Sequence, residues 1–481
     1  MKLIYVAGIR LPTEKAHGLQ IMQNCEAFAQ AGAQVSLWVT RRFNTPELRG
    51  VDPFAHYGVE RRFRLRRLPV IDLMPLVPGR SDLPARLIFA LQVVSFTLAM
   101  WLAALFTRAD VFYSRDALPL LALSLIKPRR ELAYEVHSLA HGRIGGGLQR
   151  QALRRVGHIF TTTARLRDDI IELGIDAACV HVAHDGIRRE RFADVPTQAE
   201  ARTALGWSQA AFIVGYVGRL QTMDMDKGVG LLVDALAQIG GAQLALVGGP
   251  DESAAGLRAR WIAGGQDAAG FLYAGQVKPD HVPLYLAAFD VCAMPFPWTT
   301  HFAYYASPIK LFEYMAAGRA VVASDLPSTA EVVRDGETAL LYPPGDVDAL
   351  AAALLRLRDD AALRGRLGRA ARRLVLASYT WRVRAKSILM TIANLSSVEK
   401  ENRLVLESFL SVENAQVSDY VLVSVGQEGN GNDRYVLIRK PDGVSIIIEN
   451  DDYSEKIQAQ LLLAGVEVID VNELKRRTEA D

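Results

Sequence analysis

Cysteine is scarce in this 481-residue chain, and its scarcity excludes two structural classes. Cys25, Cys179 and Cys292 lie far apart with no CxxC spacing, so neither a disulfide framework nor a zinc ribbon is expected. Such scattered, unpaired cysteines are typical of a protein in a reducing cellular compartment. Net charge is also small, because 55 Lys and Arg nearly balance 53 Asp and Glu. A net charge of +2 gives no electrostatic reason to expect nucleic acid as a partner.

A secretory signal is not recognisable in the first ten residues, MKLIYVAGIR. Their apolar run is too short for most signal peptides and has no cleavage site, so it predicts a β-strand instead. We therefore expect a cytoplasmic protein. The length predicts about three domains, each large enough to bury its own core. The hydrophobic fraction of 50% excludes a disordered chain.

Asparagine and acidic residues are unevenly distributed, and the change occurs near Ser396. Residues 397–481 carry 9 Lys and Arg against 17 Asp and Glu, whereas the preceding residues carry 46 against 36. Six of the nine asparagines lie after this point. The shift predicts a separate C-terminal module, although one protein with a more polar surface in this part is the alternative.

For residues 399–481 we expect a small α+β accessory domain with an interaction or regulatory role, since no catalytic constellation is visible there. Four apolar runs predict strands, and GQEGNGNDR between the first two predicts a hairpin loop. Helices are expected near 399–410 and 454–464.

Strand, loop and amphipathic helix alternate in two similar passes before residue 379. LIYVAG, a helix near Leu19–Ala31 and VSLWVT form the first pass. FIVGYVG, LLVDALAQI and LALVGG form the second. Such alternation predicts α/β domains with parallel sheets. We expect a Rossmann-like domain over 1–195 and another over 196–378, with a hinge near 190–200.

Ligands of such sheets bind beyond the carboxyl ends of the strands, so the loops there are the first place to look for a site. In GYVGRLQTMDMDKGVG, residues 215–230, Arg219 and Lys227 flank the beginning of a helix. Cations beside unpaired helical N–H groups favour a pyrophosphate. A solvated loop with incidental charges is the alternative.

A second loop and helix, SPIKLFEYMAAG at 307–318, has the same character. Ser307 is a suitable N-cap, Pro308 suits the first helical position, and Lys310 adds positive charge to the first turn. Glu313 follows one to two turns into the helix, where its carboxylate could accept hydrogen bonds from ribose or sugar hydroxyls. An ordinary, partly exposed helical glutamate is the alternative.

These segments resemble retaining glycosyltransferases of the GT-B fold, family 4, over about residues 3–392. The resemblance rests on GRL…DKG at 218–228, LALVGG at 244–249, FLYAGQV…LYLAAFDVCAMPF at 271–296, KLFEYMAAGRAVVASDLPSTAEVVRDGETALLYPPGD at 310–346 and YTW at 379–381. It implies two Rossmann-like domains that face each other across a cleft. It also implies a crossover helix at 379–396 that packs back on the first domain.

The resemblance further implies transfer of a sugar from a nucleoside diphosphate sugar to a hydroxyl acceptor, as in cell-surface polysaccharide or glycolipid synthesis. In this family an Arg and a Lys neutralise the donor diphosphate, a Glu holds the ribose, and a His lies near the transferred sugar. The implied catalytic residues are His137, Arg219 and Lys227, and the implied donor-binding residues are Gly18, Gly218, Ser307, Pro308, Ile309, Lys310 and Glu313.

The chain departs from the family pattern at Tyr305, where the family has the first of two paired glutamates, so the donor could differ. The loop between Arg219 and Lys227 is longer than usual. In RLPTEKAHGLQ, residues 10–20, Gly18 is expected before a helix, where it would let substrate approach the backbone. Lys15 and His17 beside it are either ligand contacts or ordinary loop charges.

Two other functions stay open at this point. A non-catalytic nucleotide-sugar sensor or scaffold would explain Tyr305 and the unassigned C-terminal module. A GT-B-fold epimerase would also bind a nucleotide sugar but would require no acceptor.

Metal motifs are weak in this sequence. Asp224-Met225-Asp226 is a DxD, but it lies in a loop where cations already provide the charge that a metal would supply. His137 and His141 stand four apart without the acidic neighbour of a zinc helix. We expect no obligatory metal and no cofactor apart from the nucleotide sugar itself. Gly145-Gly146-Gly147 lacks a preceding strand and predicts a mobile loop.

A run of 21 uncharged residues, Leu87 to Thr107, is long enough to span a membrane. Its position inside an α/β domain argues against spanning, since the strands of one sheet would then lie on opposite sides. A buried core helix is one alternative, and a helix lying in the membrane interface is the other. The basic run Arg61 to Arg67, RRFRLRR, favours the interface and an anionic membrane surface as a partner.

Overall fold

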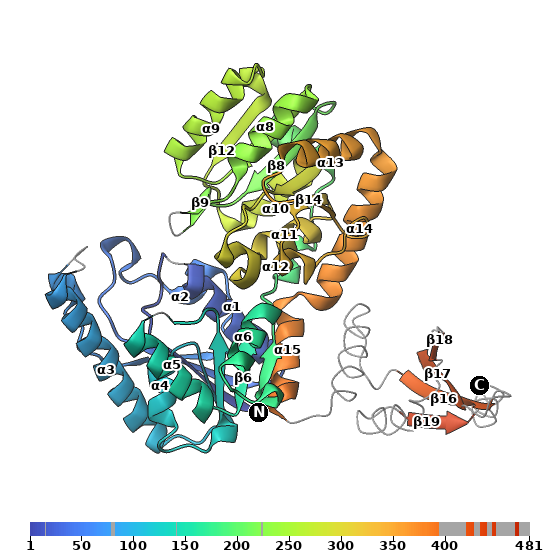
Figure 1. Cartoon of the computed structure of the whole chain (residues 1–481). Helices are drawn as coiled ribbons and strands as arrows, with labels where there is room; N and C mark the ends of the chain where they lie inside the picture. The colour runs from blue at the N-terminus through green and yellow to red at the C-terminus, as the bar shows by residue number, and fades with distance from the viewer. Residues whose placement is uncertain are drawn as a thin grey trace. The chain divides into compact units, whose positions relative to one another are not determined.

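The computed structural model describes residues 1–393, except 15, 78–81, 141, 223 and 224, together with four strands of the C-terminal part. The chain divides into two units, Met1–Ile392 and Ala393–Asp481. The division lies a few residues before the change in composition near Ser396. The first unit contains two parallel-sheet domains (Figure 1).

A seven-stranded parallel sheet forms the centre of the first domain, in the order β3-β2-β1-β4-β5-β6-β7. The order reverses between β1 and β4, and such a switch point opens a crevice at the carboxyl ends of the strands. The strands are β1 Lys2–Ala7, β2 Gln34–Thr40, β3 Arg64–Leu68, β4 Val111–Ser114, β5 Leu132–Val136, β6 His158–Thr161 and β7 Val180–Val182.

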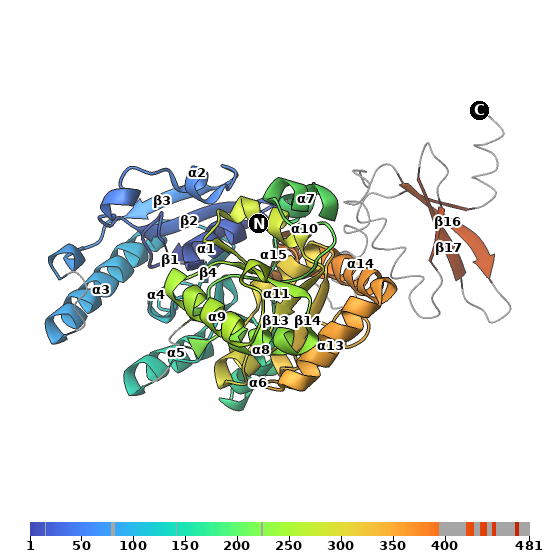
Figure 2. The same cartoon turned by 90° about the horizontal axis from the view of Figure 1, so that it is seen from above.

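Helices cover both faces of this sheet, as Figure 2 shows from above. The helices are α1 Ala16–Gln30, α2 Pro53–Tyr57, α3 Leu83–Leu105, α4 Ala117–Leu123, α5 Arg143–Arg155 and α6 Ala164–Glu172. In α1 the apolar residues Met22, Cys25 and Phe28 recur at helical spacing and pack into one core cluster with the strands. Helices α3 to α6 pack on the opposite face.

The second domain is built in the same way around a six-stranded parallel sheet, in the order β12-β11-β8-β13-β14-β15. Its strands are β8 Phe212–Val217, β11 Ala242–Val247, β12 Phe271–Gly275, β13 Val291–Met294, β14 Ala320–Ser324 and β15 Leu340–Tyr342, with a small hairpin of β9 Gln221–Thr222 and β10 Met225–Asp226. The helices are α7 Gln198–Leu205, α8 Val229–Ile239, α9 Asp251–Ala263, α10 Val282–Ala288, α11 Ile309–Ala316, α12 Pro327–Ala330, α13 Val347–Asp359 and α14 Ala361–Ser378.

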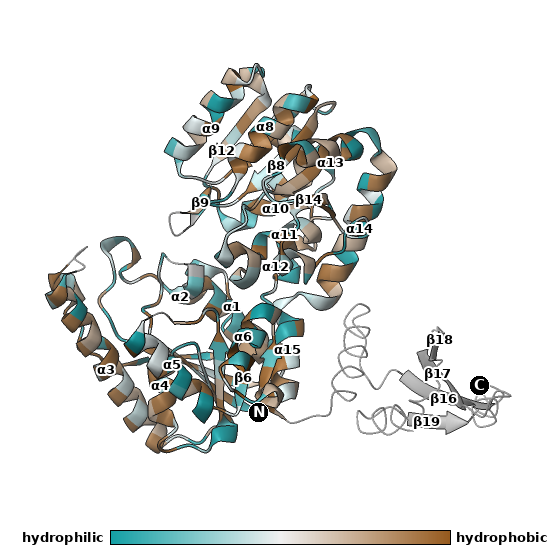
Figure 3. Ribbon diagram, in the orientation of Figure 1, coloured by the Kyte–Doolittle hydropathy of each residue, from teal (hydrophilic) through white to brown (hydrophobic). Residues whose placement is uncertain are grey.

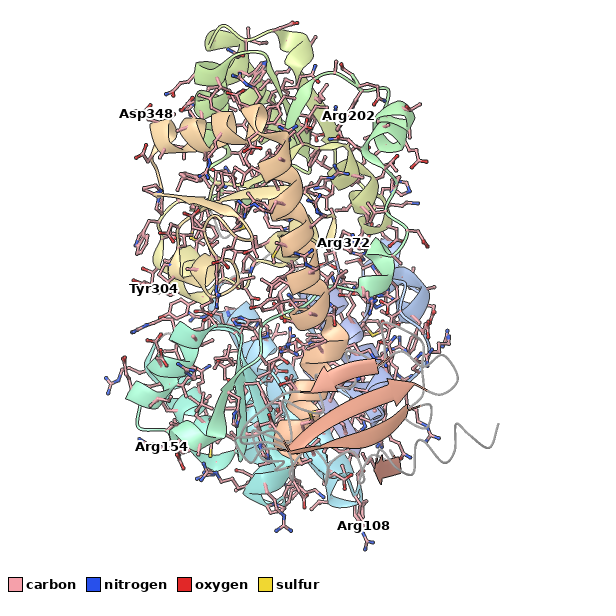
Figure 4. All side chains as sticks on the ribbon, turned by 90° about the vertical axis from the view of Figure 1, so that its right-hand side faces the viewer. Arg108, Arg154, Arg202, Tyr304, Asp348 and Arg372 are labelled. Carbon is pink, nitrogen blue, oxygen red and sulfur yellow. The ribbon has the colours of Figure 1, made fainter. Side chains whose placement is uncertain are left out.

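Helix α15, Trp381–Ile392, returns the chain to the first domain. Its Trp381, Ala385 and Ile388 pack in the same cluster as α1. Two backbone hydrogen bonds hold this return in place. Ile187 N–H donates to Tyr379 O, and Trp381 N–H donates to Ile187 O, both at 3.0 Å. Arg372 on α14, labelled in Figure 4, also donates to Phe192 O at 2.8 Å. The two domains are thus joined by two chain crossings.

The predicted parallel sheets and their two Rossmann-like domains are confirmed. The expected loop at Gly145–Gly147 is wrong, because these glycines lie inside α5. The uncharged run Leu87 to Thr107, for which a core helix and an interface helix were the alternatives, lies mostly in α3, and this helix is buried on one side only.

The C-terminal unit contains a four-stranded sheet in the order β18-β17-β16-β19. The strands β16 Tyr420–Gln427 and β17 Asp433–Arg439 pair antiparallel, as expected of a hairpin. β18 is Ser445–Ile448, and β19, Glu467–Asp470, pairs parallel with β16. The helices expected near 399–410 and 454–464 lie outside the described residues.

Candidate active site

Two lysines of the second domain lie close together beyond the carboxyl ends of β8 and β13. The Lys227 Nζ lies 4.2 Å from the ring centre of Phe302 and 4.8 Å from that of Phe296. The Lys310 Nζ lies 5.1 Å from the same Phe296 ring and 4.0 Å from the ring of Tyr216, whose hydroxyl it also contacts. Both ammonium groups therefore approach the same Phe296 ring.

The backbone around Gly228 holds Lys227 in this position. The Lys227 N–H donates to Leu220 O at 3.0 Å, and Gly228 N–H donates to the Asp226 carboxylate at 2.5 Å. Gly228 has a φ of 75°, and a Cβ on it would lie 1.8 Å from Pro295 O. Only glycine fits this contact, so the loop is tied directly to the segment that carries Phe296.

Burial changes the proton affinity of both lysines. It lowers the pKa of Lys227 to about 8. Burial also holds the pKa of Lys310 well below its ordinary value, and the charge of Lys227 lowers it further, while Glu313 opposes the shift. Two cations in a partly buried space repel each other until an anion joins them. The arrangement is suited to a group with multiple negative charges, such as a diphosphate.

Arg219 and Gly218 occupy the loop that begins this site. Gly218 has a φ of 129°, and a Cβ on it would approach Lys310 Nζ to 3.0 Å, so its backbone borders the lysine pair. The Arg219 side chain is exposed, and its backbone O accepts a hydrogen bond from Tyr216 at 2.8 Å. The structure thus brings Lys227 and Lys310 together and leaves Arg219 at the open edge of the loop.

Helix α11 begins one residue later than the sequence predicted. Ile309 is its first residue and Pro308 its N-cap, without a side-chain capping bond. The expected Ser307 cap is therefore wrong. The Ser307 hydroxyl accepts instead from Asp185 N–H at 3.3 Å, because the chain turns there toward the first domain. The helix still carries Lys310 in its first turn, so its N-terminus lies beside the lysine pair.

Glu313 lies one turn into α11, half-buried beside the same lysine. Its Oε1 is 3.5 Å from Nη1 of Arg191, which reaches in from the segment between the domains. Burial raises the pKa of Glu313, and Arg191 and Lys310 oppose that effect. Because the contact with Arg191 is long, at 3.5 Å, the Glu313 carboxylate can still accept a hydrogen bond from a hydroxyl.

His137 follows β5 at the facing edge of the first domain. Its Nε2 lies 2.7 Å from Oε1 of Glu135, a strand residue whose side chain is fully buried. The same Oε1 pairs with Arg115 at 2.7 Å and with Arg384 at 3.0 Å. Burial alone would raise the pKa of Glu135, but the two arginines outweigh it and hold that pKa well below the usual range. The histidine ring is thus fixed by an ionised carboxylate.

Sequence reasoning missed Glu135, Arg115 and Arg384. One signal was present, since Glu135 is the only charged residue in the strand LAYEV, and a carboxylate there must be paired. Its partners could not be found in this way. Arg115 follows a different strand, and Arg384 lies on α15, nearly 250 residues later.

Gly18 was expected before a helix, but it lies inside the first turn of α1. A Cβ at this position would lie 2.4 Å from the hydroxyl of Tyr57, which itself bonds both N and O of Thr13 at 2.7 and 2.8 Å. Packing against Tyr57 accounts for this glycine. Lys15 lies outside the described residues, and His17 is engaged in a contact within the protein.

Tyr305 lies in a π-helical turn, His301–Tyr305, and contacts the first domain. Its hydroxyl donates to Asp169 of α6 at 2.7 Å. The neighbouring Tyr304, labelled in Figure 4 where the domains meet, accepts from Thr163 at 2.7 Å through its backbone O. The residue that replaces the family glutamate thus serves a contact between domains.

No group of three His, Cys, Asp or Glu side chains suited to a metal is found among the residues that the structure describes. Asp224 and His141, which belong to the two weak metal motifs, lie outside these residues.

Comparison with known proteins agrees with this geometry. Residues 17–186 match the family model "Glycosyl transferase 4-like domain", and residues 211–360 match "Glycosyl transferases group 1". Phosphatidyl-myo-inositol mannosyltransferase of Mycolicibacterium smegmatis is 32% identical over 247 residues, which are 50% of this chain and 58% of the relative. D-inositol 3-phosphate glycosyltransferase of Kribbella flavida is 29% identical over 239 residues, 46% of this chain and 53% of the relative. The chain therefore matches a little over half the length of these relatives.

Solved structures show the same fold. Sucrose-phosphate synthase from Thermosynechococcus elongatus has a TM-score of 0.61 at 22% identity, covering 81% of this chain and 97% of the other. HepE of Anabaena in complex with UDP has a TM-score of 0.60 at 18% identity, covering 82% and 100%. With two family models in the expected order, one on each domain, the chain belongs to the GT-B-fold glycosyltransferases of family 4 type.

Proposed function

We propose that the protein transfers a sugar from a nucleoside diphosphate sugar to a hydroxyl acceptor, with retention of configuration, in polysaccharide or glycolipid synthesis on the cytoplasmic side of a membrane. The observation that carries the proposal is the close approach of two lysines, Lys227 in the loop before α8 and Lys310 in the first turn of α11. Their mutual approach suits a diphosphate better than any neutral ligand.

In the proposed reaction the bond between the sugar C1 and the diphosphate oxygen breaks, and the acceptor oxygen attacks C1 from the same face. The leaving phosphate oxygen takes the proton of the acceptor hydroxyl, so no separate base is needed. Lys227, Lys310 and the N–H groups of α11 stabilise the charge on the departing diphosphate. Arg219 adds charge from the loop edge. Glu313 binds ribose, and His137 contacts the sugar as charge develops.

The first test is turnover with a panel of nucleotide sugars, with and without hydroxyl acceptors. We expect release of nucleoside diphosphate that depends on the acceptor and persists in EDTA, because the lysines supply the charge that a metal would otherwise provide. Binding without turnover would favour the sensor, and donor conversion without acceptor would favour the epimerase. Loss of activity in EDTA that manganese restores would contradict metal independence.

The lowered pKa of Lys227 predicts how donor binding depends on pH. The lysine is charged below about pH 8 and attracts the diphosphate, and it loses this charge as pH rises through 8. Donor affinity should therefore fall by up to about tenfold per pH unit above that value, since binding must then take up a proton. Titration calorimetry from pH 6.5 to 9.5 measures this. Lys227→Arg, which stays charged, should reduce the slope, whereas an unchanged slope would contradict the assignment.

Helix α3 supports the membrane part of the proposal, because its apolar side faces outward. It is the one described helix long and apolar enough to cross a membrane, yet only 28% of its apolar window is buried. Exposed leucines and one valine recur along one side at spacings of three and four: Leu83, Leu87, Leu91, Val94, Leu98, Leu102 and Leu105. Figure 3 shows that most of α3 is coloured as hydrophobic. The inward side packs Phe96, Met100 and Ala104 into the core and also carries Gln92, which donates to Asp72 at 2.9 Å. The helix is therefore apolar on both sides, and its outer apolar side has no partner in this chain among the described residues.

Some arginines of the basic run Arg61 to Arg67 are already paired with carboxylates of this chain. Arg61 pairs with Asp52 at 2.9 Å, and Arg62 pairs with Glu60. Arg66 stacks on Trp38, which packs in one cluster with residues of α3. Side chains alternate along a strand, so Arg64 shares the α3 side of the sheet. Two exposed arginines therefore accompany the apolar side of α3, a combination suited to an anionic membrane surface.

A vesicle experiment tests this surface. Leu87→Gln, Val94→Gln and Leu98→Gln together should lower cosedimentation with anionic vesicles at least tenfold, because three apolar side chains no longer leave water on binding. The control is Ile262→Gln, which changes an exposed apolar residue on α9 of the second domain. High salt should weaken binding of the wild type. Equal binding by wild type and triple variant would reject α3 as the contact.

A further inference from the structure

Two arginines are held side by side at the carboxyl ends of the neighbouring strands β1 and β2. Arg10 follows β1, and Arg42 follows β2. Their backbones are joined because Thr40 donates to Ile9 O twice, from N at 3.2 Å and from Oγ1 at 2.7 Å. Neither residue belongs to the lysine site, which lies on the second domain.

The carboxylates beside Arg10 and Arg42 neutralise the two arginines only in part. Arg10 pairs with Glu14 at 2.7 and 2.8 Å, but Glu14 is 57% exposed. Arg42 Nε lies 3.6 Å from Asp72 Oδ1, which is beyond hydrogen-bond distance, and this Nε is buried without an acceptor. The Asp72 oxygens are already engaged, one by Gln92 at 2.9 Å and the other by Phe43 N–H at 2.8 Å.

Such an arrangement is unfavourable without a ligand. Burial lowers the pKa of Arg42, Asp72 opposes the shift, and the nearby charge of Arg10 lowers it again. A buried guanidinium N–H without an acceptor and a like charge beside it both cost stability. Arg67 adds a third cation at the same edge, since its Nη2 donates to Leu11 O at 3.4 Å. An anion would neutralise the excess charge.

The pair also lies directly beside α3. Gln92 of α3 holds Asp72, and Ile71 N–H donates to Ser95 Oγ of α3 at 3.0 Å. The residues that support Arg42 are therefore anchored on the helix whose outer side is apolar. A molecule with a phosphate at Arg42 could extend its apolar part along α3 and its hydroxyls toward the crevice between the domains.

We propose that Arg10 and Arg42 bind a phosphate group carried by the acceptor. The inference rests on the proposed function, in which the donor diphosphate is held elsewhere, by Lys227 and Lys310. Two chemistries supply such a phosphate: a lipid headgroup or a water-soluble phosphate ester. Arginine suits both, because its planar N–H groups bond two phosphate oxygens at once.

Titration calorimetry on the full chain tests the site with two probes, monomeric dihexanoyl phosphatidic acid and glycerol 3-phosphate. We expect at least one probe to bind, and Arg10→Gln and Arg42→Gln each to weaken it about tenfold or more. Arg49→Gln, an exposed arginine nearby, serves as the matched control and should bind as the wild type does. Tighter binding of phosphatidic acid identifies a lipid phosphate, and equal binding identifies a soluble ester.

Nucleoside diphosphate binding, measured in the same variants, shows whether each is folded, and it should not change. No sugar transfer enters the readout, so a failed activity assay and a failed phosphate site are separate results. The proposal is overturned if the wild type binds neither probe, or if both arginine variants bind as tightly as the wild type. Equal loss in Arg49→Gln would also overturn it, because the effect would then be one of general surface charge.

Discussion

Replacing Lys227 by methionine is expected to lower sugar transfer by about 10²- to 10³-fold, the usual effect of removing one preorganised group that stabilises developing charge. The ammonium lies over Phe296 and Phe302, next to Lys310, where charge on a leaving diphosphate would concentrate. Methionine keeps the apolar contacts of the lysine stem. Initial rates at saturating donor measure the loss, and Arg219→Ala should fall by a similar factor if Arg219 closes over the diphosphate.

Lys127→Met is the matched control for this change. Lys127 also places its Nζ over a phenylalanine, at 5.2 Å from the ring of Phe112, but it belongs to the first domain and bonds Thr107 O, which lies before the beginning of β4. It should keep normal turnover. The melting temperature of Lys227→Met should not fall, because a buried ammonium with a lowered pKa opposes folding at neutral pH. Near-normal transfer by both Lys227→Met and Arg219→Ala would reject the site.

The parts of this protein that could be predicted from sequence are those that local patterns determine. Strand and helix alternation fixes the two parallel sheets, and in such sheets the site must lie beyond the carboxyl ends of the strands. Lys227 and Lys310 could be found because each lies where such a loop meets a helix. Their common contact with Phe296 could not, since it depends on how the loop at Gly228 closes on Pro295.

Other features depend on contacts between segments far apart in the sequence. Serine is a residue type typical of an N-cap, but the Ser307 hydroxyl instead accepts a hydrogen bond from the backbone N–H of Asp185. Gly18 could be read as a substrate contact, but Tyr57 occupies the space beside it. The uncharged run 87–107 fits a core helix as well as a surface helix, and only the burial of each side distinguishes the two. Sequence periodicity does not carry this information.

The buried charge at Glu135 leads to the largest expected change in stability. Glu135→Gln should lower the free energy of unfolding by about 3–5 kcal/mol, because it leaves Arg115 and Arg384 buried without their shared counter-charge. Chemical unfolding in urea, followed through the first transition, measures this. Glu60→Gln is the control, since its carboxylate is exposed and its pairing with Arg62 contributes little.

The pH dependence of this loss separates a charge effect from a packing effect. The folded state holds the pKa of Glu135 well below its ordinary value of 4.5, so its stabilising contribution is fully present above that pH and is lost only as pH falls toward the folded-state pKa. The difference in free energy of unfolding between wild type and Glu135→Gln should therefore be constant from pH 8 to 5 and shrink in acid.

Adding Arg115→Met and Arg384→Met to Glu135→Leu should recover much of the stability, because no unpaired charge then remains buried. If Glu135→Gln unfolds at the same urea concentration as the wild type, then Glu135 does not join α15 to the first domain through paired charges. His137 would then need another support in the position near the transferred sugar that we propose for it.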